Sequence, residues 1–157
     1  MTIRLADPTD YGPVARLNGE VQQLHAEALP HLFKPASEQA FSRAVYEEML
    51  ARPRCSLYLA VADGEPVGYI YLEVLDRADT WFRRAHRVLY VHQLCVSSAH
   101  RRHGHGHRLL EHAAQLATQQ GIAQLELDTW WFNTGARAFF ARQGFEESNV
   151  RMVRHLP

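Results

Sequence analysis

Several stretches of the chain carry apolar residues at intervals of three and four, the spacing that places them on one face of a helix. Residues 11–27 predict a first helix with an inner face of Val14, Leu17, Val21 and Leu24. A second helix is predicted from an N-cap at Ser37 to a point before Pro53, and its inner face is Phe41, Val45 and Met49. Residues 104–120 and 133–142 predict two further helices, which the glycines Gly121 and Gly144 terminate.

Stretches rich in β-branched and aromatic residues lie between these helices and predict strands. A short strand is expected at residues 2–6 and a closing region of one or two strands at 145–155. Longer strands are predicted at residues 56–62, 66–75, 88–96 and 122–129. The dipeptide Asp63-Gly64 joins the first two of these, and it is the pair that a type I′ hairpin turn requires.

The predicted order of elements is β-α-α-β-β-β-α-β-α-β. Three consecutive strands favour antiparallel pairing, whereas the β-α-β part favours parallel pairing, so the fold class is α/β with a mixed sheet. No internal repeat, low-complexity tract or linker interrupts this order. We therefore interpret residues 1–157 as a single domain.

Composition narrows the class of protein further. Of the 157 residues, 46% are hydrophobic, which is typical of a globular chain, and 17 Lys and Arg balance 17 Asp and Glu. That balance argues against non-specific binding to nucleic acid, and no apolar run is long enough to span a membrane. The N-terminus has no pattern of a secretory signal, and Cys55 and Cys95 are expected to be free thiols, so we predict a cytoplasmic location.

The most informative segment is residues 94–107, where a strand runs into a turn and the pair Gly104 and Gly106 opens a helix. Free amides and the dipole at a helix start favour an anion, and arginines around the turn add positive charge. The segment therefore predicts a phosphate site, with a plain tight turn as the alternative. It is not a Walker loop, which needs Lys and Ser/Thr after the glycine, nor a dinucleotide fingerprint, because Leu109 stands where the third glycine would be.

Two segments resemble the motifs of the GNAT superfamily of N-acetyltransferases. Arg101-Arg102-His103-Gly104-His105-Gly106 is similar to the family's Arg/Gln-x-x-Gly-x-Gly/Ala motif, and a Leu-x-Val strand end precedes it. Residues 133–145 resemble the family's Asn-x-x-Ala-x-x-Phe-Tyr-x-x-x-Gly-Phe segment at every defined position but one. The resemblance implies a GNAT-like acyl-CoA N-acyltransferase fold, with a mostly antiparallel central sheet, a splayed parallel strand pair and flanking helices.

The resemblance also implies acetyl-CoA as co-substrate and a primary amine of a small molecule or protein as acceptor. The diphosphate of CoA is then expected on the turn, wrapped by Arg102, His103, Gly104, His105, Gly106 and His107 and flanked by Arg101. The pantetheine arm is expected to pair with the backbone of Leu94, Cys95 and Val96. Asn133 is expected to hydrogen-bond this arm, and Phe139 and Phe140 to line its path.

Aminolysis of a thioester needs a base, because an alkyl ammonium is almost wholly charged at neutral pH. Strand alternation places Val88, Tyr90, His92, Leu94 and Val96 on one face, so His92 and Tyr90 are polar groups beside the acetyl-binding edge. His92 is the first candidate base, and Glu73 is the second, acting directly or through water. A hydrogen-bonded core histidine and a solvent-facing strand glutamate are the alternative interpretations.

One departure from the family pattern concerns the general acid, which is the group that protonates the leaving thiolate. The family usually has Tyr where this chain has Phe140, so Cys95, Tyr90 or water would have to protonate the leaving thiolate. A second hypothesis follows: a catalytically weak module that binds or senses acetyl-CoA or interacts with another protein.

The remaining features add expectations about metals, partners and the acceptor. The histidines around the turn are not expected to hold a metal, because the phosphate turn uses these positions for their amides. Residues 25–34 and the loop with Trp81 and Phe82 are expected to shape the acceptor site, and residues 130–132 to pack the sheet edge beneath the cofactor. The expected partners are acetyl-CoA and the amine, without nucleic acid or membrane. A homodimer also fits, since family members are often dimers.

Overall fold

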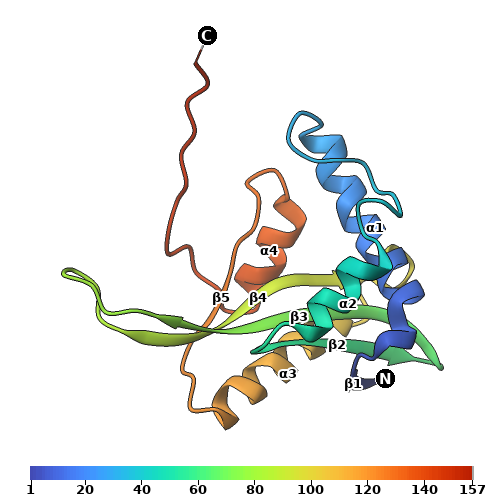
Figure 1. The fold of residues 1–157 in the computed structure, drawn as a ribbon, viewed down its shortest axis with the longest axis horizontal. Coiled ribbons are helices and arrows are strands. Elements are labelled where there is room, and N and C mark those ends of the chain that lie inside the picture. The colour runs from blue at the N-terminus through green and yellow to red at the C-terminus, as the bar shows by residue number, and fades with distance from the viewer. Residues whose placement is uncertain (157) are drawn as a thin grey trace.

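A computed structural model describes residues 1–156 of the chain, in which helices flank one five-stranded sheet (Figure 1). The strands are β1 (Thr2–Leu5), β2 (Cys55–Ala62), β3 (Glu65–Arg77), β4 (His86–Val96) and β5 (Leu125–Leu127). The helices are η1 (Pro8–Asp10), α1 (Tyr11–Ala28), α2 (Arg43–Ala51), η2 (Ser98–His100), α3 (His105–Gln119) and α4 (Thr134–Arg142). The strands follow one another in the order of the chain, antiparallel from β1 to β4 and parallel between β4 and β5. The mixed α/β fold is thus confirmed.

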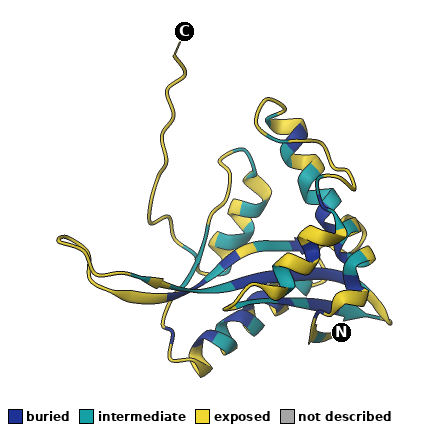
Figure 2. Ribbon diagram, in the orientation of Figure 1, coloured by how far each residue is buried: buried dark blue, intermediate teal, exposed yellow. Residues whose placement is uncertain are grey.

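Two hydrophobic clusters cover the two faces of the sheet. One joins the sheet to α3, through residues such as Leu109 and Ala113, and Phe139 and Phe140 of α4 pack against it. The other joins the sheet to α1 and α2, through residues such as Leu17. Figure 2 shows the buried positions concentrated in the central strands and on the inner sides of these helices. Among residues 1–156, no helix is both long enough and apolar enough to cross a bilayer.

The two N-terminal helices differ in detail from the prediction. α2 begins later than expected, because Ser42 and not Ser37 is its N-cap, with Oγ accepting from the amide of Val45 at 3.3 Å. The helix consequently buries Tyr46 and exposes Val45. Leu24, predicted on the inner face of α1, is exposed as well. The outer end of α1 reaches beyond the sheet, so no strand lies beneath it (Figure 1).

A β-bulge at His92 changes which face each residue of β4 occupies. Tyr71 pairs with Gln93 and Leu72 pairs with Val91, so His92 has no residue opposite it on β3. The predicted shared face of Tyr90, His92, Leu94 and Val96 is therefore wrong beyond the bulge. Tyr90 and His92 share the face of α1 and α2, whereas Leu94 and Val96 pack against the α3 cluster.

The C-terminal part of the sheet is smaller than predicted. The strand expected at residues 122–129 is reduced to β5, which pairs with β4 at only three positions. The closing strands expected at residues 145–155 are absent, since none of the described residues beyond α4 is in a strand. Residues 146–156 instead run as an extended exposed segment, which we call the tail (Figures 1 and 2).

Candidate active site

The strands β4 and β5 are paired only at their start, which leaves part of the β4 edge open. Leu89, Tyr90 and Val91 pair with β5, and within residues 1–156 no strand continues this side of β4 along 92–96. On the other side of the strand, residues 93–96 remain paired with β3. Leu94, Cys95 and Val96 thus offer backbone groups to a molecule that enters between the two strands.

The turn that follows β4 leads into α3 with unusual backbone angles. Arg102 and Gly104 have φ values of 65° and 80°, and no side chain caps the helix start at Gly104. Arg101, Arg102 and His103 are exposed there. No side chain therefore accepts from the first amides of α3, and the guanidinium groups of Arg101 and Arg102 belong to the same turn, an arrangement that suits a phosphate group.

The second glycine of the turn has a packing role. A Cβ added at Gly106 would lie 3.1 Å from Cζ of Phe139 and 3.7 Å from Cγ2 of Val96. Gly106 therefore allows α4 to approach α3 closely. A Cβ at Gly104 would meet nothing within 4 Å, so the positive φ is what favours glycine at that position.

Glu20 of α1 holds the start of this turn, a contact that the sequence analysis missed. Its carboxylate accepts from the amide of Ser98 at 2.7 Å and from Oγ of Ser97 at 3.2 Å. The guanidinium of Arg101 lies 3.9 Å away and its Nε donates to the carbonyl of Val96 at 3.3 Å. The long separation along the chain leaves no local signal for this contact.

The expected residues of α4 lie next to the turn. Asn133 is the N-cap of α4, and its Oδ1 accepts from the amide of Ala136 at 3.1 Å, which leaves its amide nitrogen free to donate to a ligand. Phe139 contacts Gly106 of the turn. The ring of Phe140 packs on that of Phe145 at a centroid distance of 5.7 Å.

The three candidate catalytic residues lie together on the α1 and α2 side of the sheet. Nε2 of His92 lies 2.5 Å from Oε2 of Glu73, and the His92 ring is 4.8 Å from that of Tyr90. Because a carboxylate oxygen accepts, Nε2 carries the proton of a neutral His92 and Nδ1 keeps the lone pair. Arg52 lies 4.0 Å from the same carboxylate oxygen. Glu73 is therefore a hydrogen-bonded partner of His92 and not a solvent-facing strand residue.

Tyr90 has an acidic partner that the sequence analysis missed. Its hydroxyl donates to Oδ2 of Asp128 at 2.6 Å. Burial, with the hydrogen bond to this carboxylate as a second cause, raises the pKa of Tyr90 to about 12. The phenol therefore keeps its proton at neutral pH. The feature that could have indicated this partner is the position of Asp128 directly after β5, the strand that pairs with β4.

The thiol of Cys95 points away from the open edge. Its Sγ donates to the carbonyl of Leu17 in α1 at 3.1 Å, and the residue is only 2% exposed. Burial raises the pKa of this thiol to about 12. The side chain is therefore poorly placed to protonate a thiolate, although its backbone remains part of the open edge. Both cysteines are free thiols, and Cys55 is half-buried.

The histidines of the turn contact different partners. Nδ1 of His107 lies 2.6 Å from Oε1 of Gln143, and the rings of His103 and His105 stack at 6.1 Å. Burial, followed by the nearby charge of His103, lowers the pKa of His105. Among residues 1–156, no group of three or more His, Cys, Asp or Glu side chains is arranged to hold a metal ion.

Aromatic rings join the segment after α1 to the segment after β5. The ring of Phe33 lies 5.1 Å from that of Trp130, and the ring of His25 lies 5.0 Å from Phe33 and 5.6 Å from Phe132. Trp130 and Phe132 therefore contact residues of the expected acceptor wall and do not serve only to pack the sheet edge. Trp81 and Phe82 are exposed in the loop that joins β3 to β4, where their rings lie 4.9 Å from each other.

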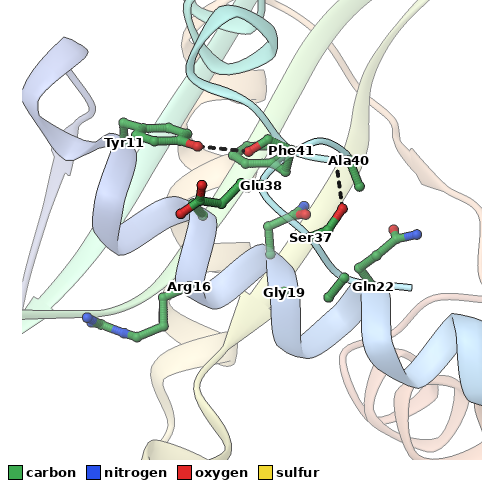
Figure 3. A pocket seen from close by; sticks show the side chains of 11 residues that line it. Tyr11, Arg16, Gly19, Gln22, Ser37, Glu38, Ala40 and Phe41 are labelled. Atoms are coloured by element: carbon green, nitrogen blue, oxygen red, sulfur yellow. Dashed lines mark hydrogen bonds between the residues drawn. The ribbon is translucent and has the colours of Figure 1, made fainter. Parts of the chain in front are cut away.

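A separate pocket of about 340 Å³ lies between α1 and the segment before α2. Figure 3 shows Arg16 and Glu38 at this pocket, with the Tyr11 hydroxyl donating to the carbonyl of Phe41. Neither Glu73, Tyr90 nor His92 lines it. We therefore place the candidate active site at Glu73, Tyr90 and His92 and at the open edge of β4, not at this pocket.

Comparison with known proteins points to the same family as the motifs at the turn and in α4. The sequence profile of the acetyltransferase (GNAT) family matches residues 20–145. An uncharacterized N-acetyltransferase of Methanocaldococcus jannaschii is 25% identical over 126 residues, which are 76% of this chain and 54% of the relative. The chain thus spans about half the length of that curated relative.

Solved structures share the fold. A mutant of the BH1408 protein from Bacillus halodurans superposes with a TM-score of 0.95 at 22% identity, over 100% of both chains. The aminoglycoside N-acetyltransferase AAC(6')-Iy in complex with CoA has a TM-score of 0.76 at 19% identity, over 99% of this chain and 93% of that one.

Proposed function

This chain belongs to the acetyltransferase (GNAT) family, and on that premise we propose that it transfers the acetyl group of acetyl-CoA to a primary amine. One observation carries the proposal: an unpaired stretch of β4 edge is followed, after η2 and the turn, by a helix start that no side chain caps. The first feature suits an amide-bearing arm and the second suits a diphosphate. In acetyl-CoA the reactive thioester is followed first by the amide-bearing arm and then by the diphosphate.

The proposed donor site follows the β4 edge. The amides of the turn from Arg102 to His107 bind the diphosphate, with Arg101 beside it. The backbone of residues 94–96 binds the pantetheine arm, which Asn133 contacts through its free amide nitrogen. Phe139 and Phe140 form the apolar side of this path, and both already pack together at 5.3 Å.

The proposed chemistry is direct aminolysis without a covalent enzyme intermediate. Nδ1 of His92 accepts a proton from the ammonium, and Glu73 holds the imidazole through Nε2 and stabilises its charged form. The neutral amine then attacks the thioester carbonyl, and a backbone N–H of the open edge donates to the oxyanion. Collapse of the tetrahedral intermediate breaks the C–S bond, and the second proton that the nitrogen loses passes through the Tyr90 hydroxyl or water to the departing thiolate.

The proposed acceptor side lies on the α1 and α2 face of the sheet. It contains the carboxylates of Glu73 and Asp128 and the aromatic group of Phe33, Trp130 and Phe132. Carboxylates favour the approach of a cationic amine, which can be that of a small molecule or of a protein. We further propose a single catalytic domain that works in the cytoplasm.

A second candidate function is a catalytically weak module that binds acetyl-CoA as a signal or as part of a protein complex. The absence of a hydroxyl at Phe140 and the inward thiol of Cys95 favour it, because neither side chain can donate a proton to the leaving group. Both functions require the same donor site.

An acceptor screen separates the two functions. The purified chain is mixed with acetyl-CoA and a library of primary amines, and thiol release is followed against a buffer background. Thiol release that depends on an amine and on His92 supports the transferase. Tight acetyl-CoA binding without thiol release above background would replace it by the binding module.

A further inference from the structure

Three polar side chains form a hydrogen-bonded network between α1 and the sheet. The hydroxyl of Tyr69 in β3 donates to Oε1 of Gln93 in β4 at 2.8 Å. Nδ2 of Asn18 in α1 donates to the Tyr69 hydroxyl at 3.1 Å and to the same Oε1 at 3.4 Å. Asn18 and Tyr69 are buried, with exposed fractions of 9% and 1%. A network so well shielded from water holds the side-chain amide of Gln93 in one orientation.

The network determines which end of the Gln93 side chain remains free. Burial raises the pKa of Tyr69, so its hydroxyl keeps the proton that it donates. Oε1 of Gln93 accepts two hydrogen bonds, which occupy both of its lone pairs. Nε2 of this half-buried residue has no hydrogen-bond partner among residues 1–156 and is not fully buried. The N–H groups of Nε2 are therefore available to a bound molecule.

The bulge in β4 brings Gln93 to the same side of the sheet as His92. Gln93 pairs with Tyr71 of β3, and the His92 ring lies 5.4 Å from the ring of Tyr71. Tyr69 and Tyr71 both belong to the hydrophobic cluster of α1 and α2, which identifies that side. In a regular strand two successive side chains, with Cα atoms about 3.8 Å apart, would point to opposite faces. The bulge thus places the candidate base and an amide donor next to each other.

We propose that Gln93 determines which amines are acetylated, by donating from Nε2 to a carbonyl oxygen that the acceptor carries beside its amine. This inference rests on the proposed function, since it concerns the acceptor of the same reaction. The acceptor that fits is an α-amino amide, such as the N-terminal residue of a peptide. Its carbonyl group is attached to the carbon that bears the amine, so the amine faces His92 while the carbonyl faces Gln93. Asn18 and Tyr69 are positioning residues, because they act through Gln93.

The local charges favour a neutral carbonyl over a carboxylate. Oε2 of Glu73 lies 2.5 Å from Nε2 of His92, and Asp128 accepts from the Tyr90 hydroxyl. Both carboxylates would repel the carboxylate of a free amino acid. Arg52 is the cation beside Glu73, at 4.0 Å, so its charge is already offset. Among acceptors with an α-amine, a peptide or an amino acid amide is therefore favoured over the free amino acid.

An amine without a neighbouring carbonyl, such as the side chain of lysine or a polyamine, offers no partner to Nε2 of Gln93. When such an acceptor covers Nε2, the side-chain amide loses water and gains no hydrogen bond, which costs binding free energy. A site that leaves a polar group unpaired discriminates more strongly than one that relies on apolar contact alone. Gln93 therefore favours an N-terminal amine over the amine of a lysine side chain.

Glycinamide and isobutylamine separate these two classes of acceptor. They have nearly the same shape, but only glycinamide carries a carbonyl beside its amine. Initial rates of thiol release from acetyl-CoA give kcat/KM for each amine. Because the two amines differ in basicity, each variant is compared with the unaltered chain for one amine at a time. Gln93→Met, which keeps the length of the side chain and removes the donor, is expected to lower kcat/KM for glycinamide by about 10-fold and to leave that for isobutylamine unchanged.

Three further variants separate donation by Nε2 from a packing role. Gln93→Glu keeps an oxygen that accepts from Tyr69 and Asn18 but removes the donor, so it is expected to lower kcat/KM for glycinamide and not for isobutylamine. Tyr69→Phe releases the Gln93 amide and is expected to raise KM for glycinamide alone, with kcat little changed. Gln119→Met, at an exposed glutamine of α3, is the matched control and is expected to leave both amines unaffected.

The possible results distinguish this inference from the proposed function. Equal losses for both amines in Gln93→Met, or no loss for glycinamide, would overturn the role of Gln93. Acetyl-CoA affinity is expected to be unchanged in every variant, and a loss of affinity in Gln93→Met would contradict an effect confined to the acceptor. Transfer to other amines but not to glycinamide would overturn the inference and leave the transferase in place. Transfer to none of the amines in the acceptor screen would refute the transferase itself.

Discussion

His92 and Glu73 form a hydrogen-bonded pair across two neighbouring strands, with 2.5 Å between Nε2 and the carboxylate oxygen. The bulge in β4 leaves His92 without a residue opposite it, and Glu73 reaches it from the position paired with Tyr90. The pair fixes which ring nitrogen is protonated, and this leaves the lone pair of Nδ1 available for the proposed role as base.

Replacement of His92 by Ala is expected to reduce kcat/KM by about 100-fold or more, which is the usual contribution of a general base. Glu73→Gln keeps a hydrogen-bonding group but removes the charge, and is expected to cause a smaller loss, mainly in kcat. Steady-state kinetics with the acceptor found by the screen measures both. Acetyl-CoA affinity should be unchanged in each variant. Unaltered kcat/KM in His92→Ala would remove this residue from the role of base.

Phe140→Tyr is expected to raise kcat, because it adds a proton donor at the position where the family usually has one. The ring is half-buried against Phe145, so Phe145→Tyr is the matched control that adds a hydroxyl to the same aromatic group. Single-turnover kinetics separates the chemical step from product release. An unchanged rate in Phe140→Tyr would mean that Tyr90 or water already supplies the proton.

A change of either glycine of the turn to Ala should weaken acetyl-CoA binding, but for a different reason in each case. Gly104→Ala introduces strain of about 1–2 kcal/mol at a positive φ and should weaken acetyl-CoA binding. Gly106→Ala brings a Cβ to 3.1 Å from Phe139, so a second change, Phe139→Leu, should restore part of the binding lost in Gly106→Ala. Phe139→Leu should not rescue Gly104→Ala. Binding is measured by calorimetry, and equal rescue of both variants would refute this assignment.

Local patterns were sufficient for most of the fold, because helix faces, the Asp63-Gly64 turn and the glycine stops are each encoded within a few residues. The β4 face was wrongly predicted beyond His92, since a bulge inserts one residue and strict alternation cannot reveal it. The cap of α2 was misplaced because Ser37 and Ser42 are both good caps, and burial of Tyr46 decides between them.

The turn into a helix at residues 101–107 was predictable because its motif is contiguous, whereas contacts that join distant segments were much less so. Glu20 reaches Ser98 and Asp128 reaches Tyr90 only after the sheet is assembled. The pairing of His92 with Glu73 likewise depends on the register between β3 and β4. The tail was predicted to supply one or two closing strands, but none of residues 146–156 pairs with a strand of the sheet.

His112 of α3 should make stability depend on pH. Its Nε2 is buried, has no hydrogen-bond partner among residues 1–156, and the ring lies 4.5 Å from Tyr58. Burial lowers the pKa of His112, so below the ordinary histidine pKa of about 6.5 the unfolded chain binds the proton more readily. The contribution of His112 is therefore complete above that pH and is lost as the pH falls.

The free energy of unfolding of His112→Leu, measured in urea, should fall less than that of the unaltered chain between about pH 8 and about pH 5. His86→Leu, at an exposed histidine of β4, is the control and should follow the unaltered chain. Parallel pH curves for His112→Leu and the unaltered chain would show that the buried ring is not responsible.

The most direct test of the whole account is a calorimetric titration of the unaltered chain with acetyl-CoA. The open β4 edge and the uncapped start of α3 predict binding at one site per chain, with a dissociation constant between about 1 μM and about 1 mM. Acetyl-CoA that fails to bind the folded chain within that range would contradict the central claim.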